Sequence, residues 1–231
     1  RLIPGEDTTI EYKPKYLDAS LISQSPSIAI GQAKQEIIRM GQYSVQGLQE
    51  AMQHINTYDK KHVNTAAQIE EAINRLDQKT TEYLVSISKK SLSGHDSKVH
   101  NVLLENIRDI ERIGDHVENL FELTEFIENN GAQLSEDAMQ ELNDMLELVV
   151  QTASLAIQSL DQLDVNVAKQ VLANEDQIDH MERKLRKNHI VRLNNGICTG
   201  SAGVIFVDLI SNLERVGDHA ANIAESVIEV K

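Results

Sequence analysis

Hydrophobic residues recur in two segments of the chain with the spacing of helices that pack in a bundle. In residues 209–227 the apolar positions follow each other in alternating steps of four and three, and residues 110–120 show the same spacing. A narrow apolar seam of this kind is typical of a bundle helix. The seam residues are Leu209, Leu213, Val216, Ala220, Ile223 and Val227, with Ile110, Ile113, Val117 and Leu120 in the earlier segment.

Prolines and turn residues divide the chain into predicted elements. All three prolines lie in the first 26 residues. Proline breaks helices, so we expect an irregular lead-in over residues 1–24 and helices alone after it. Ser25 is a candidate cap before Pro26, and glycine or Asn-Asn-Gly sequences mark later turns. The predicted helices cover approximately residues 25–57, 60–91, 96–129, 135–162, 164–193 and 203–230.

One hexapeptide occurs twice. Glu-Arg-(Ile/Val)-Gly-Asp-His spans residues 111–116 and again 214–219, an offset of 103. A second register of 105 matches Glu70 with Glu175 and Ile73 with Ile178. Such self-similarity indicates two copies of one ancestral unit. We therefore predict an all-α fold of two tandem three-helix bundles, residues 25–131 and 132–231, related by an approximate internal twofold axis.

Composition narrows the class of protein. Only 3% of residues are aromatic and none is Trp, which argues against a β-sandwich or β-barrel core. The net charge of −14 argues against nucleic acid as a partner. A single cysteine and the lack of a long apolar run predict a cytosolic chain. We find no nucleophile–base pair and no nucleotide motif, so we do not expect an enzyme.

The repeated hexapeptide supplies the candidate chemistry. Glu111 and Asp115, like Glu214 and Asp218, are four residues apart, which places each pair on one helix face where the two carboxylates could share a cation. Like charges at this spacing destabilise a helix unless something neutralises them. Angles around the helix predict that the pairs face away from the local bundle. The alternative reading is a solvated helix face.

A second set of carboxylates is predicted to lie near an apolar stripe. In the helix expected over residues 164–193, Glu175 and Glu182 fall close to the stripe that contains Ile178. A carboxylate in that position needs a partner: a metal ion, an arginine of a neighbouring helix such as Arg112 or Arg215, or water. The candidates for additional metal ligands or ion-pair partners are Glu70, Glu175 and Asp179.

The glycines and histidines of the hexapeptide allow two interpretations each. Gly114 and Gly217 indicate a close approach to the backbone, either by a crossing helix or by a ligand. His116 and His219 each follow an Asp directly, about 100° further around the helix, so His and Asp would rarely reach one ion. We therefore predict supporting or helix-packing roles for the histidines, with metal ligation as the alternative.

Together these residues resemble the PhoU family of phosphate-homeostasis proteins over residues 25–231. The resemblance implies a pair of three-helix bundles that bind multinuclear metal clusters on the surface, with iron the first expectation and zinc, nickel, manganese and magnesium as alternatives. It makes Glu111, Asp115, Glu214 and Asp218 the metal ligands. Asp208 and Glu105, equivalent at the offset of 103, are expected to complete the sites, with His116, His219, Arg112 and Arg215 around them.

The flanking segments are similar to one branch of that family. Residues 14–18, 25–30, 36–41 and 192–198 resemble bacterial sodium/phosphate cotransporters, which end in a cytosolic PhoU-like domain. The resemblance implies a regulatory domain at the cytoplasmic face of the inner membrane, cut from a longer polypeptide. Its expected partners are the membrane transport domain of that polypeptide and metal ions, with inorganic phosphate and a second copy as further candidates.

Two alternatives to the cotransporter domain stay open. One is a free-standing PhoU protein that acts on a phosphate ATP-binding-cassette transporter and its histidine kinase, and the other is an all-α multinuclear metalloenzyme. The halves also differ in places. Asn74 stands where Asp179 does, and Asn212 where Asp109 does, so the two sites are expected to differ in metal number or occupancy.

Overall fold

The structure, a computed structural model, describes residues 10–230, and every element in that range is an α-helix, which confirms the predicted class. Residues 1–9 of the predicted lead-in lie outside the described residues. A one-turn helix, α1, interrupts the part of the lead-in that is described. The helices are α1 (Leu21–Gln24), α2 (Pro26–Thr57), α3 (Lys60–Ser88), α4 (Gly94–Asn129), α5 (Glu136–Gln162), α6 (Val165–Asn194) and α7 (Gly200–Val230).

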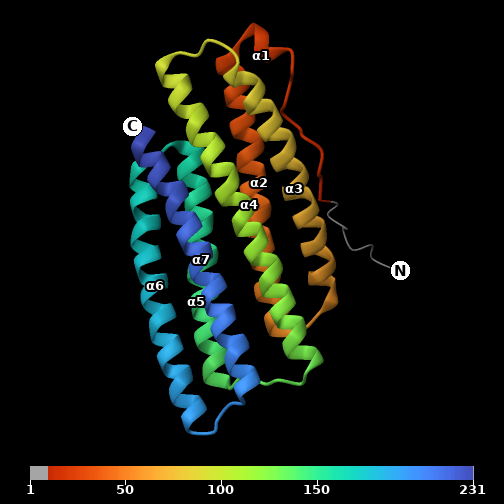
Figure 1. The fold of residues 1–231 in the computed structure, drawn as a ribbon, viewed down its shortest axis with the longest axis vertical. Coiled ribbons are helices and arrows are strands. Elements are labelled where there is room, and N and C mark those ends of the chain that lie inside the picture. The colour runs from red at the N-terminus through yellow and green to blue at the C-terminus, as the bar shows by residue number, and fades with distance from the viewer. Residues whose placement is uncertain (1–9, 231) are drawn as a thin grey trace, which may run out of the picture.

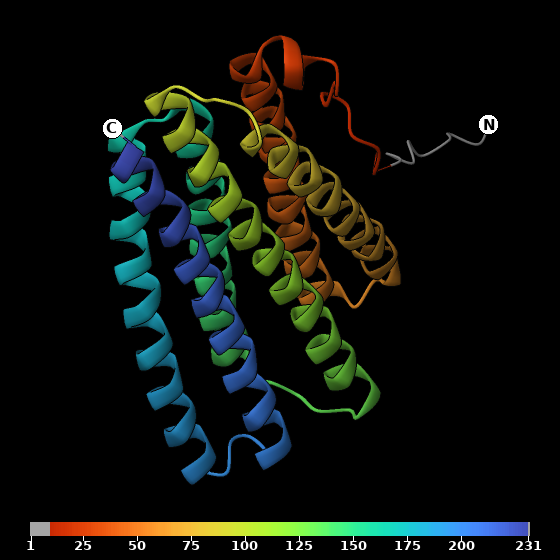
Figure 2. The same ribbon diagram turned by 45° about the horizontal axis from the view of Figure 1, so that its top comes forward.

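The long helices form two three-helix bundles side by side (Figure 1). Helices α2, α3 and α4 make the first bundle, and α5, α6 and α7 make the second. The bundles meet where α4 packs against α7 and α2 against α5, while α3 and α6 lie on opposite outer sides (Figure 2). Within residues 10–230, no helix is long and apolar enough to cross a bilayer.

The duplication is visible in the helix connections. Tyr58 directly follows α2 and Leu163 directly follows α5, and both are non-glycine residues in the left-handed region, with φ of 53° and 49°. The next residue in each copy, Asp59 or Asp164, caps the following helix through its carboxylate, which accepts from Lys61 N at 3.0 Å or Asn166 N at 2.8 Å. Each residue of the second turn lies 105 positions after its counterpart in the first, so both repeats have the same turn.

The predicted seams do form the core. The seam residues of α4 and α7 are all buried. Where the bundles meet, a Cβ on Gly41 of α2 would lie 2.3 Å from the side chain of Ile157, so glycine allows α2 and α5 to approach closely. One cap was predicted wrongly: the Ser25 side chain makes no capping hydrogen bond, although Pro26 does open α2.

A buried ion pair fastens the lead-in to α2. The carboxylate of Glu36 is fully buried, and its Oε2 accepts from the backbone N–H groups of Lys15 at 2.8 Å and Tyr16 at 3.0 Å. Arg39 pairs with the other oxygen of Glu36 and donates to the carbonyl oxygen of Lys13 at 2.9 Å. Residues 13–16 are therefore held against the first bundle by charge-assisted hydrogen bonds.

Candidate metal centre between α6 and α7

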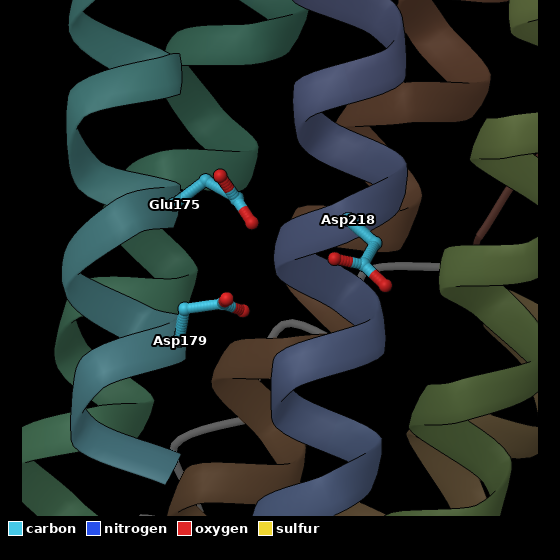
Figure 3. Close-up of side chains that lie close together, drawn as sticks. All are labelled: Glu175, Asp179 and Asp218. Carbon is cyan, nitrogen blue, oxygen red and sulfur yellow. The ribbon is translucent and has the colours of Figure 1, made fainter. Parts of the chain in front are cut away.

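Three carboxylates converge where α6 lies beside α7 in the second bundle. Glu175 and Asp179 are one turn apart on α6 and face Asp218 of α7 (Figure 3). One oxygen from each of them lies within 4.8 Å of the others. Glu175 and Asp179 are half-buried, while Asp218 is exposed, so the group is open to solvent on one side. Oxygen atoms at this spacing could coordinate one metal ion.

The predicted outward direction of the hexapeptide carboxylates was wrong in part. Asp218 is exposed, but it points toward α6 of its own bundle. Glu214, one turn earlier, is half-buried. The prediction measured angles from a single apolar seam, whereas α7 packs against α4, α5 and α6. Members of the two predicted sets of carboxylates therefore lie close together between α6 and α7.

Electrostatics around these carboxylates favour a cation. Burial, followed by the negative charges of Asp179 and Asp218, raises the pKa of Glu175. Burial and the charge of Asp179 raise the pKa of Asp218, and burial and the charge of Asp218 raise the pKa of Glu214. Ionisation of Glu175, Glu214 and Asp218 is thus less favourable beside the negative charges of their neighbours. A bound cation would relieve this repulsion.

Arginine from a neighbouring helix does not supply that cation, as one of the sequence interpretations proposed. Glu182 pairs with Arg186 of its own helix, and Asp179 accepts from Arg183, also on α6, at 3.1 Å. Within residues 10–230, Arg215 makes no ion pair within 4.0 Å. It lines a different groove, between α4 and α7. The partners are local because residues four apart on a helix reach each other without any tertiary contact.

In the first bundle the equivalent carboxylates are partly neutralised. Arg112 pairs with Asp115 at 3.0 Å and lies 3.7 Å from Glu111. Asn74, which replaces the acidic residue of the second copy, donates to Glu70 Oε1 at 3.2 Å. In the part of the chain that the structure describes, no group of three carboxylates comes together here as it does in the second bundle. Metal binding by Glu111 and Asp115 stays a prediction.

The hexapeptide glycines serve helix packing. A Cβ on Gly114 would lie 3.2 Å from Ile73 of α3, and a Cβ on Gly217 would lie 3.3 Å from Ile178 of α6. Both glycines thus let an isoleucine of the neighbouring helix approach the backbone. Of the two sequence interpretations, the crossing helix is the one observed.

The hexapeptide histidines lie between the bundles. Their rings stack at the α4–α7 contact, with centroids 5.6 Å apart. His116 Nδ1 is 2.9 Å from Asn212 Oδ1, and His219 Nδ1 is 2.9 Å from Asp109 Oδ1. Because 109 and 116 correspond to 212 and 219 at the offset of 103, these contacts are reciprocal across the internal twofold. The two contacts differ in one respect: His116 contacts the amide of Asn212, whereas His219 contacts the carboxylate of Asp109.

The two remaining predicted ligands lie outside the carboxylate group. Asp208 lines the groove between α4 and α7, near Asn119 and Arg215. Glu105 and Glu111 line a groove between α3 and α4 that also contains Asp77. The expectation that Asp208 completes a site with Asp218 is not supported by this placement. The ten residues from Asp208 to Asp218 turn the helix by about 1000°, which places the two side chains about 80° apart around the axis.

The raised pKa values predict how stability depends on pH. A carboxyl group whose pKa is higher in the folded protein opposes folding when ionised and stops opposing it as pH falls through its folded pKa. In chelator, Asp218→Asn should therefore melt about 1–2 °C above the unsubstituted chain near pH 8. That gain should shrink as the pH falls and the native carboxyls protonate. Melting curves at decreasing pH provide the test, and a gain independent of pH would contradict it.

Comparisons with known proteins agree with a fold of two three-helix repeats. The PhoU domain family model matches residues 37–124 and 142–227, one match in each bundle. Among curated proteins, a phosphate-specific transport system accessory protein PhoU homolog from Thermotoga maritima is 24% identical over 208 residues, which covers 86% of this chain and 85% of that protein. A homolog of the same description from Xylella fastidiosa is 27% identical over 193 residues, 84% of this chain and 80% of that protein.

Solved structures share the fold. The crystal structure of PhoU from Pseudomonas aeruginosa superposes with a TM-score of 0.81 at 19% identity, covering 87% of this chain and 95% of that one. The phosphate transport system regulatory protein PhoU from Streptococcus pneumoniae gives 0.80 at 19% identity, covering 89% and 96%. The family match spans both repeats and most of the sequence, and the chain therefore belongs to the PhoU family.

Proposed function

We propose that this chain is a PhoU-type regulator of phosphate transport that binds a metal ion through Glu175, Asp179 and Asp218 at the cytoplasmic face of the membrane. The observation that carries the metal site is the convergence of three carboxylate oxygens within 4.8 Å. The transport role is supported by the matched relatives, which are accessory proteins of phosphate-specific transport systems. The proposal includes no catalytic step.

The donor set fits a metal ion. All three groups supply oxygen, the ligand type that hard cations such as magnesium and manganese prefer. Glu214 adds a fourth negative charge nearby, which contributes to the raised pKa of Glu175. The iron cluster implied by the family resemblance stays part of the proposal, with zinc and nickel as alternatives. A site that needs more than one ion would draw further ligands from Glu214 or from water.

The comparisons support an accessory protein better than a cotransporter domain. Matched relatives are accessory proteins, and 80–85% of their length is covered. The similarity of residues 14–18 and 192–198 to cotransporters remains, but the relatives named above are described as accessory proteins. We therefore propose that the chain acts on a phosphate transporter as a separate regulatory unit.

The proposed metal site is adjacent in sequence to a residue of the contact between the two bundles. Asp218 of the carboxylate group precedes His219, which contacts Asp109 of α4 at 2.9 Å. A cation near Asp218 would change the charge beside this contact. A regulator responds to a ligand only through different affinities for two states, and a coupling of about 1–3 kcal/mol is typical. We propose that the α4–α7 contact is the element that differs between those states.

Metal analysis tests the proposal. We expect purified protein, incubated with iron, manganese or magnesium salts and desalted, to retain one of these metals in atomic emission measurements. A bound metal should raise the melting temperature by mass action, by several degrees at about 100-fold excess over Kd. Inorganic phosphate should change the metal retained if it bridges the ion. Protein that retains none of the metals and melts identically in chelator would disprove the metal site.

A further inference from the structure

A cavity of about 240 Å³ opens between α3 and α4 of the first bundle, apart from the carboxylate group described above. Its walls are apolar side chains from α3, including Val63, Ile69 and Ile73, and from α4, including Val117 and Phe121. Helix α3 packs against α2 and α4 and lies on the side of the molecule away from the second bundle (Figure 1). The second bundle therefore leaves this groove open to a partner.

Four carboxylates border the groove. Glu70 of α3 and Glu118, Glu122 and Glu125 of α4 line the cavity together with the apolar residues, and no lysine, arginine or histidine lines it. Within residues 10–230, none of the four is within 4.0 Å of a basic side chain. Burial, and then the charges of Glu70 and Glu122, raise the pKa of Glu118. A partner that fills the apolar groove would need to bring positive charge to its border.

The carboxylates of α4 continue a regular stripe. The acidic positions 111, 115, 118, 122 and 125 follow steps of four and three, which places them along one face of the helix. Fourteen residues of helix correspond to about 21 Å. A second helix with basic residues at the same spacing could pair with this face along several turns.

The second repeat keeps only part of this set. At the offset of 103, Glu225 stands where Glu122 does, but Ala221 stands in place of Glu118, Ala224 in place of Phe121, and Ile228 in place of Glu125. The same three-helix bundle forms with these residues, so the fold does not require Glu118, Glu125 or the aromatic ring. The two halves therefore differ: within residues 10–230, a group of three carboxylates lies in the second, and the acidic apolar groove described here lies in the first.

We propose that the α3–α4 groove is the docking site for a basic amphipathic helix of a partner polypeptide. One large apolar side chain of that helix enters the cavity beside Phe121, and flanking lysines or arginines pair with Glu118, Glu122 and Glu125. The spacing of the carboxylates favours a helical partner, and the volume of the cavity favours a single anchor side chain. This surface does not include Glu175, Asp179 or Asp218, the proposed metal ligands, so either proposal stands if the other fails.

A second copy of this chain fits the groove less well. Its own basic segment, residues 183–187 of α6, has exposed Ile190 and Val191 beyond it. Helix α6 is on the opposite outer side from α3, so such a contact would join copies head to tail and leave the assembly open (Figure 2). Two of the basic residues, Arg183 and Arg186, are also already paired within α6.

A designed peptide tests the groove. The probe is a fluorescein-labelled, alanine-based helix with lysines spaced four and three residues apart around one leucine, measured by fluorescence anisotropy in chelator. We expect Glu118→Gln/Glu122→Gln/Glu125→Gln to weaken binding by about 20-fold or more, because it removes three charges at the groove. A charge-matched control, Glu147→Gln/Glu225→Gln/Glu229→Gln on α5 and α7, should change it by less than about threefold.

The apolar anchor has its own test. Replacing the probe's leucine by alanine should weaken binding by about tenfold, and Ala67→Phe, which fills the cavity from α3, should remove that difference. Circular dichroism melts confirm that each variant folds. Equal losses in the two triple variants would show that the peptide senses only net charge and would overturn the proposal. So would tight binding of spermidine or magnesium that competes with the peptide at this site, or peptide-independent self-association lost only in the groove variant.

Discussion

Asp218→Asn is expected to weaken metal binding to this chain by about 100-fold. Within residues 10–230, Asp218 is the carboxylate that α7 contributes to the group with Glu175 and Asp179. Asparagine keeps the size and one oxygen but removes the charge, and the affinity of carboxylate sites spans several decades with ligand charge. Calorimetric titration with manganese or ferrous iron measures the change. Because repulsion falls when the charge is lost, the variant should fold at least as well in chelator.

Two further variants locate the site. Asp176→Asn, on the same helix but outside the three-carboxylate group, should leave affinity within about threefold. Asp115→Asn, the first-repeat counterpart of Asp218→Asn, tests the sequence prediction of a second site. If metal affinity falls equally in Asp176→Asn and Asp218→Asn, the ion is held by diffuse negative charge, and the assignment of Asp218 as a ligand fails.

Glu36→Ala is expected to lower the free energy of unfolding by about 3 kcal/mol. Glu36 is fully buried, and its removal leaves the Arg39 guanidinium and the N–H groups of Lys15 and Tyr16 without their acceptor. Removing one member of a buried ion pair typically costs about 3–5 kcal/mol. Urea denaturation measures the loss, and trypsin should cleave after Lys15 faster in the variant.

An exposed pair provides the control for Glu36. Glu71 pairs with Arg75 on the surface of α3, with 55% of the Glu71 side chain exposed. Glu71→Ala should therefore change the free energy of unfolding by less than about 1 kcal/mol. A Glu36→Ala variant as stable as Glu71→Ala, with unchanged cleavage after Lys15, would mean that the lead-in is not anchored by this pair.

The sequence alone determined the fold class, the six long helices and the duplication. These follow from local properties: the three-and-four spacing of apolar residues, the confinement of proline to residues 4–26, and a hexapeptide repeated at a fixed offset. The residue types of the candidate metal site were also predicted, because like charges one turn apart need a partner wherever the helix lies.

Only the tertiary structure decided which carboxylates meet. Helix geometry gives the direction of a side chain from its own axis but not the position of the neighbouring helix. The sequence therefore placed Glu175 near an apolar stripe and Asp218 on an outward face, and only the packing of α6 beside α7 brings them together with Asp179. The α3–α4 cavity was not predicted from the sequence either. The acidic positions 111–125 on its border can be read from the sequence, but its apolar walls come from two helices, and only the packing of those helices makes a cavity.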